Sequence, residues 1–478
     1  MPIMPRVMPA AHAELVSDAP QSLHNGQRAS APLSGVRVVE VGRFAAGPAC
    51  ATVLADWGAE VIKIEPPGGD PARGKGVLED REGPRVNPRF EVHNRSRRSV
   101  VLDLRVPQGR AAADRLFAAA DVVVANLSPR KLRTLAMDAA TLRGRHPHLV
   151  VAQISGYDPG TPLAGERSYD HGAYWSYSGA AALFTGPDGQ PPQPAGGFGD
   201  RAAGSVLAGA VAAALFARQR TGVGSHVTTS LLSTGMWLMA SDVSDVLVTG
   251  RAHRSSDRRQ AAVPTVNCFR TLDARWLWLQ VMEPERDWER LVAALDAAWL
   301  DEDPRFRGGD LARLRSNREA LTELLDEIFR ARSLPEWAAR LTQHEIIWAP
   351  VRTLEEAVTD CVEHSSAAIV SFDDEFGRRH VSVNSPVLFD GVTPRRATRA
   401  PGAGENTLDV LASAGLTESE IVELKRTGAL GTAGADAVSP AASTAVLSSR
   451  EERSDPWGTA MSWSSMTAAT ESSESAAP

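Results

Sequence analysis

Apolar runs of β-branched residues alternate with helical segments along the first third of the chain. Buried strands are predicted at 35–42 (GVRVVEVG), 60–67, 99–105, 121–127 and 149–157. Helical spacing fills the intervals, with one helix ending near Gly58 and another starting at Pro107. This alternation predicts an α/β protein with a parallel sheet and helices on both of its faces.

The pattern changes between about 262 and 350. NCFRTLDARWLWLQVM predicts a β-hairpin, and NREALTELLDEIFRARSLPEWAARLTQH has the spacing of amphipathic helices. We therefore expect a smaller α+β domain over 241–350. It would be inserted into a large domain that comprises 32–240 and 351–428.

The returning part of the large domain is expected to hold strands followed by helices. RRHVSVNSPVLF predicts the strands, and ENTLDVLASAGLTESEIVELKRTG predicts the closing helices. Thr417 stands three residues before Glu420, which is the spacing of a capping box. Residues 1–31 and 429–478 are rich in Ala, Pro and Ser without periodicity, so both extensions are expected to be disordered.

Composition narrows the possible functions. At 478 residues the chain exceeds what one core usually fills, which agrees with two domains. A formal net charge of −7 without a clustered basic face argues against nucleic acid as a partner. The short basic group of Arg95, Arg97 and Arg98 fits a solvated loop or a site for a small polyanion.

Cellular location is also suggested by composition. No stretch approaches the roughly 20 apolar residues of a membrane span, so no membrane partner is expected, and 206–217 is interpreted as a buried helix. Cys50, Cys268 and Cys361 show no C-x-x-C spacing, which fits a reducing compartment and no structural metal. Without a recognisable secretory signal, the protein is expected to be cytoplasmic.

The first turn, VEVGRFAAGPAC, places glycines between a predicted strand and a predicted helix. In a parallel sheet this position suits an anionic nucleotide ligand, because free backbone N–H groups and the helix dipole point at it. The spacing of Gly42 and Gly47 is not G-x-G-x-x-G, so the fingerprint of a nicotinamide-dependent oxidoreductase is absent. On spacing alone, a tight strand–helix turn explains the segment equally well.

Asp200 stands where the glycine-rich GGFGD turn leads into an Ala-rich helix. As a helix N-cap it would stabilise the fold by about 1 kcal/mol. The same place suits a nucleophile, since a helix N-terminus favours negative charge by about 0.3–1 kcal/mol. Gly197 and Gly199 would let a substrate approach the backbone. The residues alone leave both interpretations open.

The segment ERSYDHGAYWSYSGAAALFTG concentrates aromatic residues in a chain that is only 6% aromatic. Tyr174, Trp175, Tyr177 and Phe184 fit either a contribution to the core or a pocket for a medium-length or aryl-bearing acyl group. His171 lies among them, and a lone histidine is more often structural than catalytic. Motifs of serine hydrolases, zinc proteases and P-loop proteins are absent.

Several segments, in order, resemble the type III CoA-transferases, the family of formyl-CoA and carnitine CoA-transferases. They are residues 32–74, NRSRRSVVLDLR, ADVVVANLSPRKLRTL, GDRAAGSVLAGAVAAALFARQRTGVGSHVTTSLL, APVRTLEEAVTD and RAPGAGENTLDVL. The resemblance spans residues 32–428 and implies an acyl-CoA:carboxylate CoA-transferase. It also implies a Rossmann-like sheet, an inserted small domain and an interlocked homodimer. Coenzyme A would be a substrate, with no tightly bound cofactor and no metal.

Matched residue by residue, the resemblance gives Asp200 the role of the nucleophile, which forms an aspartyl anhydride and then an enzyme–CoA thioester. It also assigns contacts to CoA. They are Arg43, Phe44, Ala45, Ala46, Leu102, Arg105, Asn126 and Leu127 for the nucleotide portion, and Tyr169 and Asp170 beside the thioester. Arg105 stands where a lysine is common, which keeps a cation for phosphate.

Departures from the family pattern bear on the substrate. Ala45 replaces a polar residue of formyl-CoA transferase, and that enzyme's run of glycines in the small domain has no counterpart, so formate and oxalate are not expected. A related 2-methylacyl-CoA racemase would carry a histidine where Tyr169 stands. An unperturbed phenol, with a pKa near 10, is a poor base at pH 7, so the racemase is disfavoured. A catalytically silent CoA-binding paralogue, with Asp200 as a cap alone, is the remaining alternative.

Overall fold

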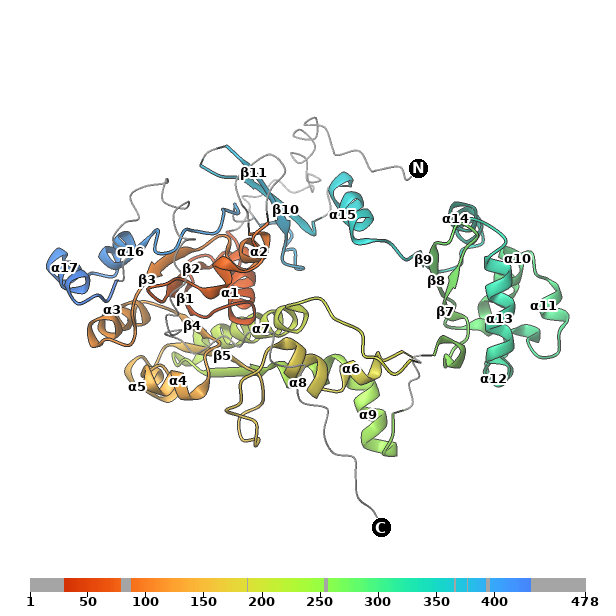
Figure 1. Cartoon of the computed structure of the whole chain (residues 1–478), viewed down its shortest axis with the longest axis horizontal. Coiled ribbons are helices and arrows are strands. Elements are labelled where there is room, and N and C mark those ends of the chain that lie inside the picture. Colours follow the sequence, from red (N-terminus) through yellow and green to blue (C-terminus); the bar gives the residue numbers. More distant parts are fainter. Residues whose placement is uncertain are drawn as a thin grey trace, which may run out of the picture. The chain divides into compact units, whose positions relative to one another are not determined.

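A six-stranded parallel sheet is built from the first half of the chain (Figure 1). The computed structural model describes residues 30–430 except 79–86, 187, 253–256, 365–366, 376 and 393–395. The strand order is β3-β2-β1-β4-β5-β6, with every neighbouring pair parallel. The strands are β1 (Arg37–Val41), β2 (Glu60–Glu65), β3 (Arg98–Val101), β4 (Val122–Ala125), β5 (Val150–Ser155) and β6 (His226–Ser230). The predicted α/β class is confirmed.

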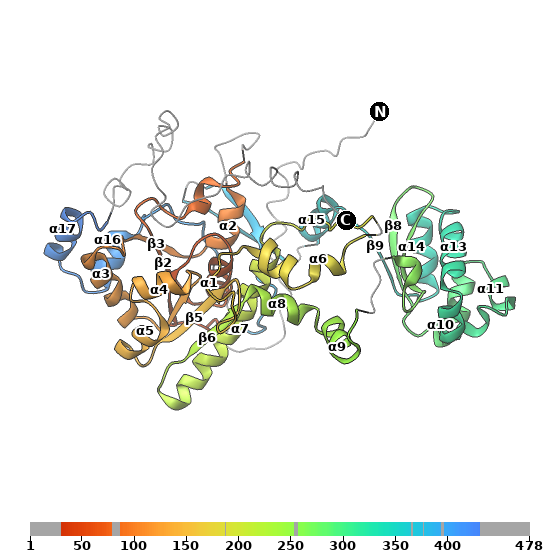
Figure 2. The same ribbon diagram turned by 60° about the horizontal axis from the view of Figure 1, so that its bottom comes forward.

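Two helices pack against each other and on this sheet, α1 (Ala46–Asp56) and α7 (Phe198–Thr221) (Figure 2). Their close approach needs a glycine, because a Cβ at Gly204 would lie 2.8 Å from the Ala49 Cβ. Sequence inspection missed that α7 has the length and composition that a membrane span requires. In this structure Leu207 and Val211 of α7 lie in the core with α1.

Both faces of the sheet are covered. Val38 and Val122 belong to the core shared with α1 and α7, and the alternate residues Val39 and Val123 are equally buried. The other helices of this part are α2 (Pro88–Asn94), α3 (Pro107–Ala118), α4 (Pro129–Thr134), α5 (Ala139–Arg145), α6 (Ala180–Leu183), α8 (Leu231–Leu238) and α9 (Ala240–Thr249). Short helical turns occur at η2 (Pro71–Gly74) and η3 (His171–Tyr177).

A second hydrophobic core surrounds an antiparallel sheet of β7 (Val266–Arg270), β8 (Trp276–Gln280) and β9 (Trp348–Pro350). The β7–β8 pair is the predicted hairpin. Stacked rings of Phe269 and Phe329, with Trp337 beside them, fill the centre. The helices are α10 (Pro284–Ala294), α11 (Trp299–Glu302), α12 (Leu311–Ser316), α13 (Arg318–Phe329) and α14 (Leu334–Gln343), with turns at η4 (Arg258–Gln260) and η5 (Arg307–Gly309). The division into a large and an inserted small domain stays a prediction.

The chain then forms α15 (Leu354–Glu363), the antiparallel pair β10 (Ile369–Asp373) and β11 (Arg379–Val383), α16 (Thr407–Ser413) and α17 (Glu418–Arg426). The predicted capping box of Thr417 and Glu420 is present. Of the strands predicted over 378–389, β11 is present and ends at Val383, and Pro386 beyond it lacks the N–H that a strand pair needs.

The end of the described chain returns to strand β3. Asn406 Oδ1 accepts the Ser99 N–H at 2.9 Å, and the Asn406 N–H donates to Ser99 O at 3.0 Å. Thr407 Oγ1 accepts the Val101 N–H at 3.1 Å. Ala31, Ala429 and Leu430, which the sequence pattern places in the extensions, are buried. The rest of the predicted extensions, 1–29 and 431–478, lies outside the described residues.

Candidate active site

The turn between β1 and α1 is held in an unusual conformation. Phe44 has φ of 63°, in the left-handed region that non-glycine residues rarely adopt. Asn126 fixes the preceding peptide groups, since its Oδ1 accepts the Arg43 N–H at 3.0 Å and its Nδ2 donates to Arg43 O at 2.8 Å. Asn126 also explains the glycine at 47, where a Cβ would lie 3.2 Å from its Cγ. Its amide therefore supports the turn.

This turn offers unused donors. The N-cap of α1 is Ala45, which has no side-chain cap. The backbone N–H groups of Ala46 and Gly47 have no acceptor among the described residues. The Arg43 guanidinium and the Lys75 ammonium lie 5.7 and 5.3 Å from the centre of the Phe44 ring. Open N–H groups, a helix N-terminus and two cations together form an environment suited to phosphate.

Asp200 is not the N-cap of α7. The helix begins at Phe198 after Gly197, which has φ of 75° and is the N-cap, so Asp200 is the third residue of the helix. Its carboxylate accepts no hydrogen bond from any described residue, and the backbone N–H groups of Gly199 and Asp200 are also unused there. The capping interpretation is therefore wrong, and the acid has no structural partner that explains it.

The electrostatic setting of Asp200 raises its pKa from 3.8 to about 7. Burial is the largest cause and the negative charge of Asp170 the second, while Arg201 and His171 act in the opposite direction. Asp170 is itself buried and accepts from the His171 N–H at 3.0 Å, with His171 Nδ1 at 2.9 Å. A carboxylate of raised basicity is a stronger nucleophile once it has lost its proton.

The first turn and the Asp200 turn meet. A Cβ at Gly197 would lie 3.9 Å from the Ala45 Cβ. The Phe44 ring contacts the ring of Tyr169 edge-on, with centroids 5.8 Å apart. Tyr169 directly precedes Asp170, so the first turn, the Tyr169–Asp170 pair and Asp200 form one site.

Four of the residues predicted to contact CoA have contacts within the chain, and their role towards CoA stays a prediction. The side chains of Leu102 and Leu127 are buried, and the Leu102 N–H donates to Glu65 O. Arg105 is paired with Asp103 at 2.7 Å, so a phosphate would share the Arg105 guanidinium with that carboxylate. Asn126 supports the Arg43 peptide as described above.

Sequence reasoning missed a buried charge network beneath the site. Glu40 and Lys63, on neighbouring strands, are both fully buried and lie 3.2 Å apart. Arg97 donates to Glu40 at 2.9 Å, and Arg95 pairs with Asp56 at 2.6 Å. Neither the solvated-loop nor the polyanion interpretation of these two arginines is therefore correct. The available signal was the charge at 40 and 63 within apolar strands.

No group of three His, Cys, Asp or Glu side chains that could hold a metal ion occurs in the described ranges.

Comparison with known proteins agrees with this architecture. Residues 33–407 match the model of CoA-transferase family III. The chain is 29% identical over 394 residues to (R)-2-hydroxy-4-methylpentanoate CoA-transferase of Clostridioides difficile, which covers 82% of this chain and 98% of that protein. It is 30% identical over 397 residues to succinate–glutarate CoA-transferase of Agrobacterium fabrum, covering 80% and 95%. The crystal structure of a CAIB/BAIF family protein from Brucella suis superposes with a TM-score of 0.70 at 26% identity, covering 81% and 100%.

The chain therefore belongs to CoA-transferase family III, and the resemblance seen in the sequence is confirmed. As a member of that family it is a CoA-transferase, acting on acyl-CoA and carboxylate substrates.

Proposed function

We propose that this enzyme moves CoA from an acyl-CoA donor to a free carboxylic acid through covalent intermediates on Asp200. The observation that carries the proposal is the state of the Asp200 carboxylate. It is half-buried, has no hydrogen-bond partner among the described residues, and lies beside unused N–H groups at a helix start. A purely structural aspartate would be expected to accept such bonds.

The reaction begins when the Asp200 carboxylate attacks the thioester carbonyl of the donor. The C–S bond breaks, CoA leaves as a thiolate, and a mixed anhydride forms. The thiolate then attacks the aspartyl carbonyl, which gives an enzyme–CoA thioester and releases the donor acid. Because CoA stays held by its nucleotide, this return attack is effectively intramolecular.

The acceptor acid reverses these two steps. Its carboxylate attacks the enzyme–CoA thioester, forms a second mixed anhydride and expels the thiolate again. Attack of the thiolate on the acyl carbonyl of the new anhydride yields the product acyl-CoA and the free Asp200 carboxylate. We assign the stabilisation of oxyanions near Asp200 to the Gly199 N–H, which has no acceptor among the described residues.

The nucleotide part of CoA is assigned to the first turn. Open N–H groups at Ala46 and Gly47 and the cations of Arg43 and Lys75 support phosphate binding there. The Phe44 ring offers a surface for the adenine or pantetheine portion.

We propose that the acids between which CoA moves carry a medium-length or aryl-bearing acyl group. Tyr174 contacts Phe198 at the start of α7, two residues before Asp200, with centroids 6.1 Å apart. Trp175 and Phe184 stack at 5.6 Å on the same segment.

We also propose an interlocked homodimer. Its support is the exposure of apolar side chains on α8 and α9, such as Trp237 and Val248.

The test is intact-mass analysis after incubation with a panel of acyl-CoAs, with hydroxylamine to trap activated carboxyl groups. A hydroxamate at Asp200, absent in D200N, is the expected result. D138N, at an aspartate that caps α5 instead, is the matched control and should still be labelled. Exchange of the α-proton with solvent deuterium and no covalent species would favour a racemase, while CoA binding without either reaction would favour a silent paralogue.

A further inference from the structure

The buried side chain of Asp70 holds the turn in which Phe44 has its left-handed conformation. Asp70 Oδ1 accepts the Phe44 N–H at 3.3 Å, and the same oxygen accepts the Ala72 N–H at 2.9 Å. Asp70 is only 2% exposed. Since Phe44 lies in a backbone region that side chains disfavour, this hydrogen bond helps keep a conformation the residue would otherwise leave.

Lys63 joins Asp70 to the opposite side of the turn. Its Nζ lies 2.9 Å from Asp70 Oδ2 and donates to Gly42 O at 3.1 Å. Although burial lowers the pKa of Lys63, the carboxylates of Glu40 and Asp70 raise it above its ordinary value, so Lys63 is a buried ammonium. The turn is thus anchored at Gly42 by Lys63, at Arg43 by Asn126 and at Phe44 by Asp70.

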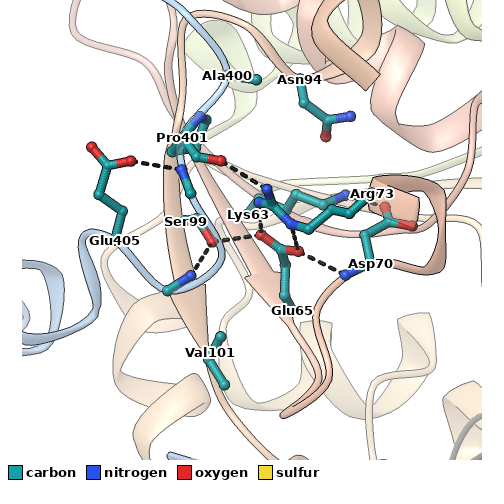
Figure 3. Close-up of polar contacts among 12 residues, drawn as sticks. Lys63, Glu65, Asp70, Arg73, Asn94, Ser99, Val101, Ala400, Pro401 and Glu405 are labelled. Atoms are coloured by element: carbon teal, nitrogen blue, oxygen red, sulfur yellow. Dashed lines mark hydrogen bonds and ion pairs between the residues drawn. The ribbon is translucent and has the colours of Figure 1, made fainter. Parts of the chain in front are cut away.

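Asp70 is in turn fixed by a larger network (Figure 3). Its own N–H donates to Glu65 Oε2 at 2.7 Å, and Glu65 also accepts from Arg73 Nη2 at 2.6 Å and Ser99 Oγ at 2.5 Å. From there Arg73 reaches Pro401 O at 2.9 Å. Asp70 therefore connects the first turn to a buried network of hydrogen bonds and ion pairs.

We propose that Asp70 is a positioning residue for CoA, which holds the Phe44 turn so that the Phe44 ring and the open N–H groups of α1 face the nucleotide. The ligand named here rests on the proposed function. No role in bond making is assigned to Asp70, because its carboxylate is enclosed and already engaged by Lys63 and two backbone N–H groups. Its loss should weaken CoA binding more than it slows chemistry.

The experiment is calorimetric titration of the full-length protein with desulfo-CoA, which binds without reacting. D70A is expected to raise the Kd at least tenfold. D70N keeps an oxygen acceptor for Phe44 but turns an amide towards Lys63, and should raise the Kd at least threefold; it carries the test if D70A does not fold. D56A is the control, because the Asp56 side chain is only 9% exposed and forms an ion pair with Arg95, at the far end of α1 from the turn.

Several results would overturn the proposal. They are an unchanged Kd in folded D70A or D70N, and an equal rise in D56A. A Phe44→Gly background supplies a sharper readout, since glycine adopts positive φ freely. There D70A should weaken binding less than threefold, and an undiminished effect would show that Asp70 does not act through the turn. Failure of the unaltered protein to bind desulfo-CoA would instead refute the proposed CoA site, and this inference with it.

In steady-state assays, D70N should raise the KM for acyl-CoA by the same factor as the Kd and change kcat less than threefold. A fall in kcat with unchanged KM would place Asp70 in the chemical step and contradict a positioning role.

Discussion

Replacing Asp200 by Asn is expected to stabilise the protein at pH 8, although it removes the proposed nucleophile. Burial and the charge of Asp170 raise the pKa of Asp200 from 3.8 to about 7 in the folded chain. At a pH between these two pKa values, the Asp200 carboxyl group keeps its proton in the folded protein and has lost it in the unfolded chain. Stability therefore falls as the pH rises from about 4 to about 7, and stays reduced at higher pH.

The size of the effect follows from that difference. The pKa rises from 3.8 to about 7, and about 1.36 kcal/mol for each pKa unit gives an upper estimate of about 4 kcal/mol. Asn has nearly the same shape and no charge, so it avoids this cost. For about 400 ordered residues, about 4 kcal/mol corresponds to roughly 5 °C in Tm. D200N should therefore melt roughly 5 °C above the unaltered protein at pH 8 and within about 1 °C of it at pH 4.

Thermal melts followed by calorimetry between pH 4 and pH 9 measure this difference. D138A is the control, and its Tm should change in the opposite direction. Asp138 Oδ1 accepts the Thr141 N–H at 3.0 Å and caps α5, so its removal should lower the Tm at pH 8. If D200N melted at or below the temperature of the unaltered protein at pH 8, ionised Asp200 would be a stabilising group, and the reasoning about its burial would be refuted.

Two further outcomes follow from the same site. The rate of covalent labelling by acyl-CoA should rise with pH around a midpoint near 7, because Asp200 must lose its proton, and D170N should move that midpoint lower. Rapid-quench labelling across pH checks this, and an unmoved midpoint would contradict the role of Asp170. G199A should destabilise the fold by about 1–3 kcal/mol, because its Cβ would lie 2.3 Å from the Tyr174 Cγ. Thermal melts should show that G199A costs much less stability in a Y174A background than in the unaltered protein. An equal cost in both backgrounds would place the strain elsewhere.

Apolar runs were sufficient to predict the central strands, because both faces of the sheet are buried. Strand β6 was not predicted, since it lies at an edge and its first four residues alternate between exposed and partly buried. An edge strand of this kind lacks the continuous apolar run on which the prediction depends.

The position of Asp200 within its helix shows a different limit. Three glycines precede it in the GGFGD turn, and each of them can end or start a helix. Only the backbone angles show that Gly197 is the cap and that Asp200 lies inside the first turn. The choice between cap and nucleophile therefore could not be made from the order of residues.

The buried network depends on sheet order, which local sequence does not contain. Glu40 and Lys63 are each flanked by apolar residues within their strands, and they lie 23 positions apart in the sequence. The parallel register of β1 and β2 places them opposite each other. Once that register is known, their pairing and the support of the first turn follow.

The hydrogen bonds from Asn406 and Thr407 to β3 have a consequence for how the chain is made. They close the outer edge of the sheet, yet Ser99 and Asn406 are 307 residues apart in sequence. At roughly 5–20 residues per second, a ribosome takes about 15–60 s to cover that interval. During this time the N–H and C=O groups of β3 can pair with a strand from another chain. A protein shortened before residue 404 would keep this edge open permanently, so we expect fragments of that kind to aggregate even when the rest of the parallel sheet has formed.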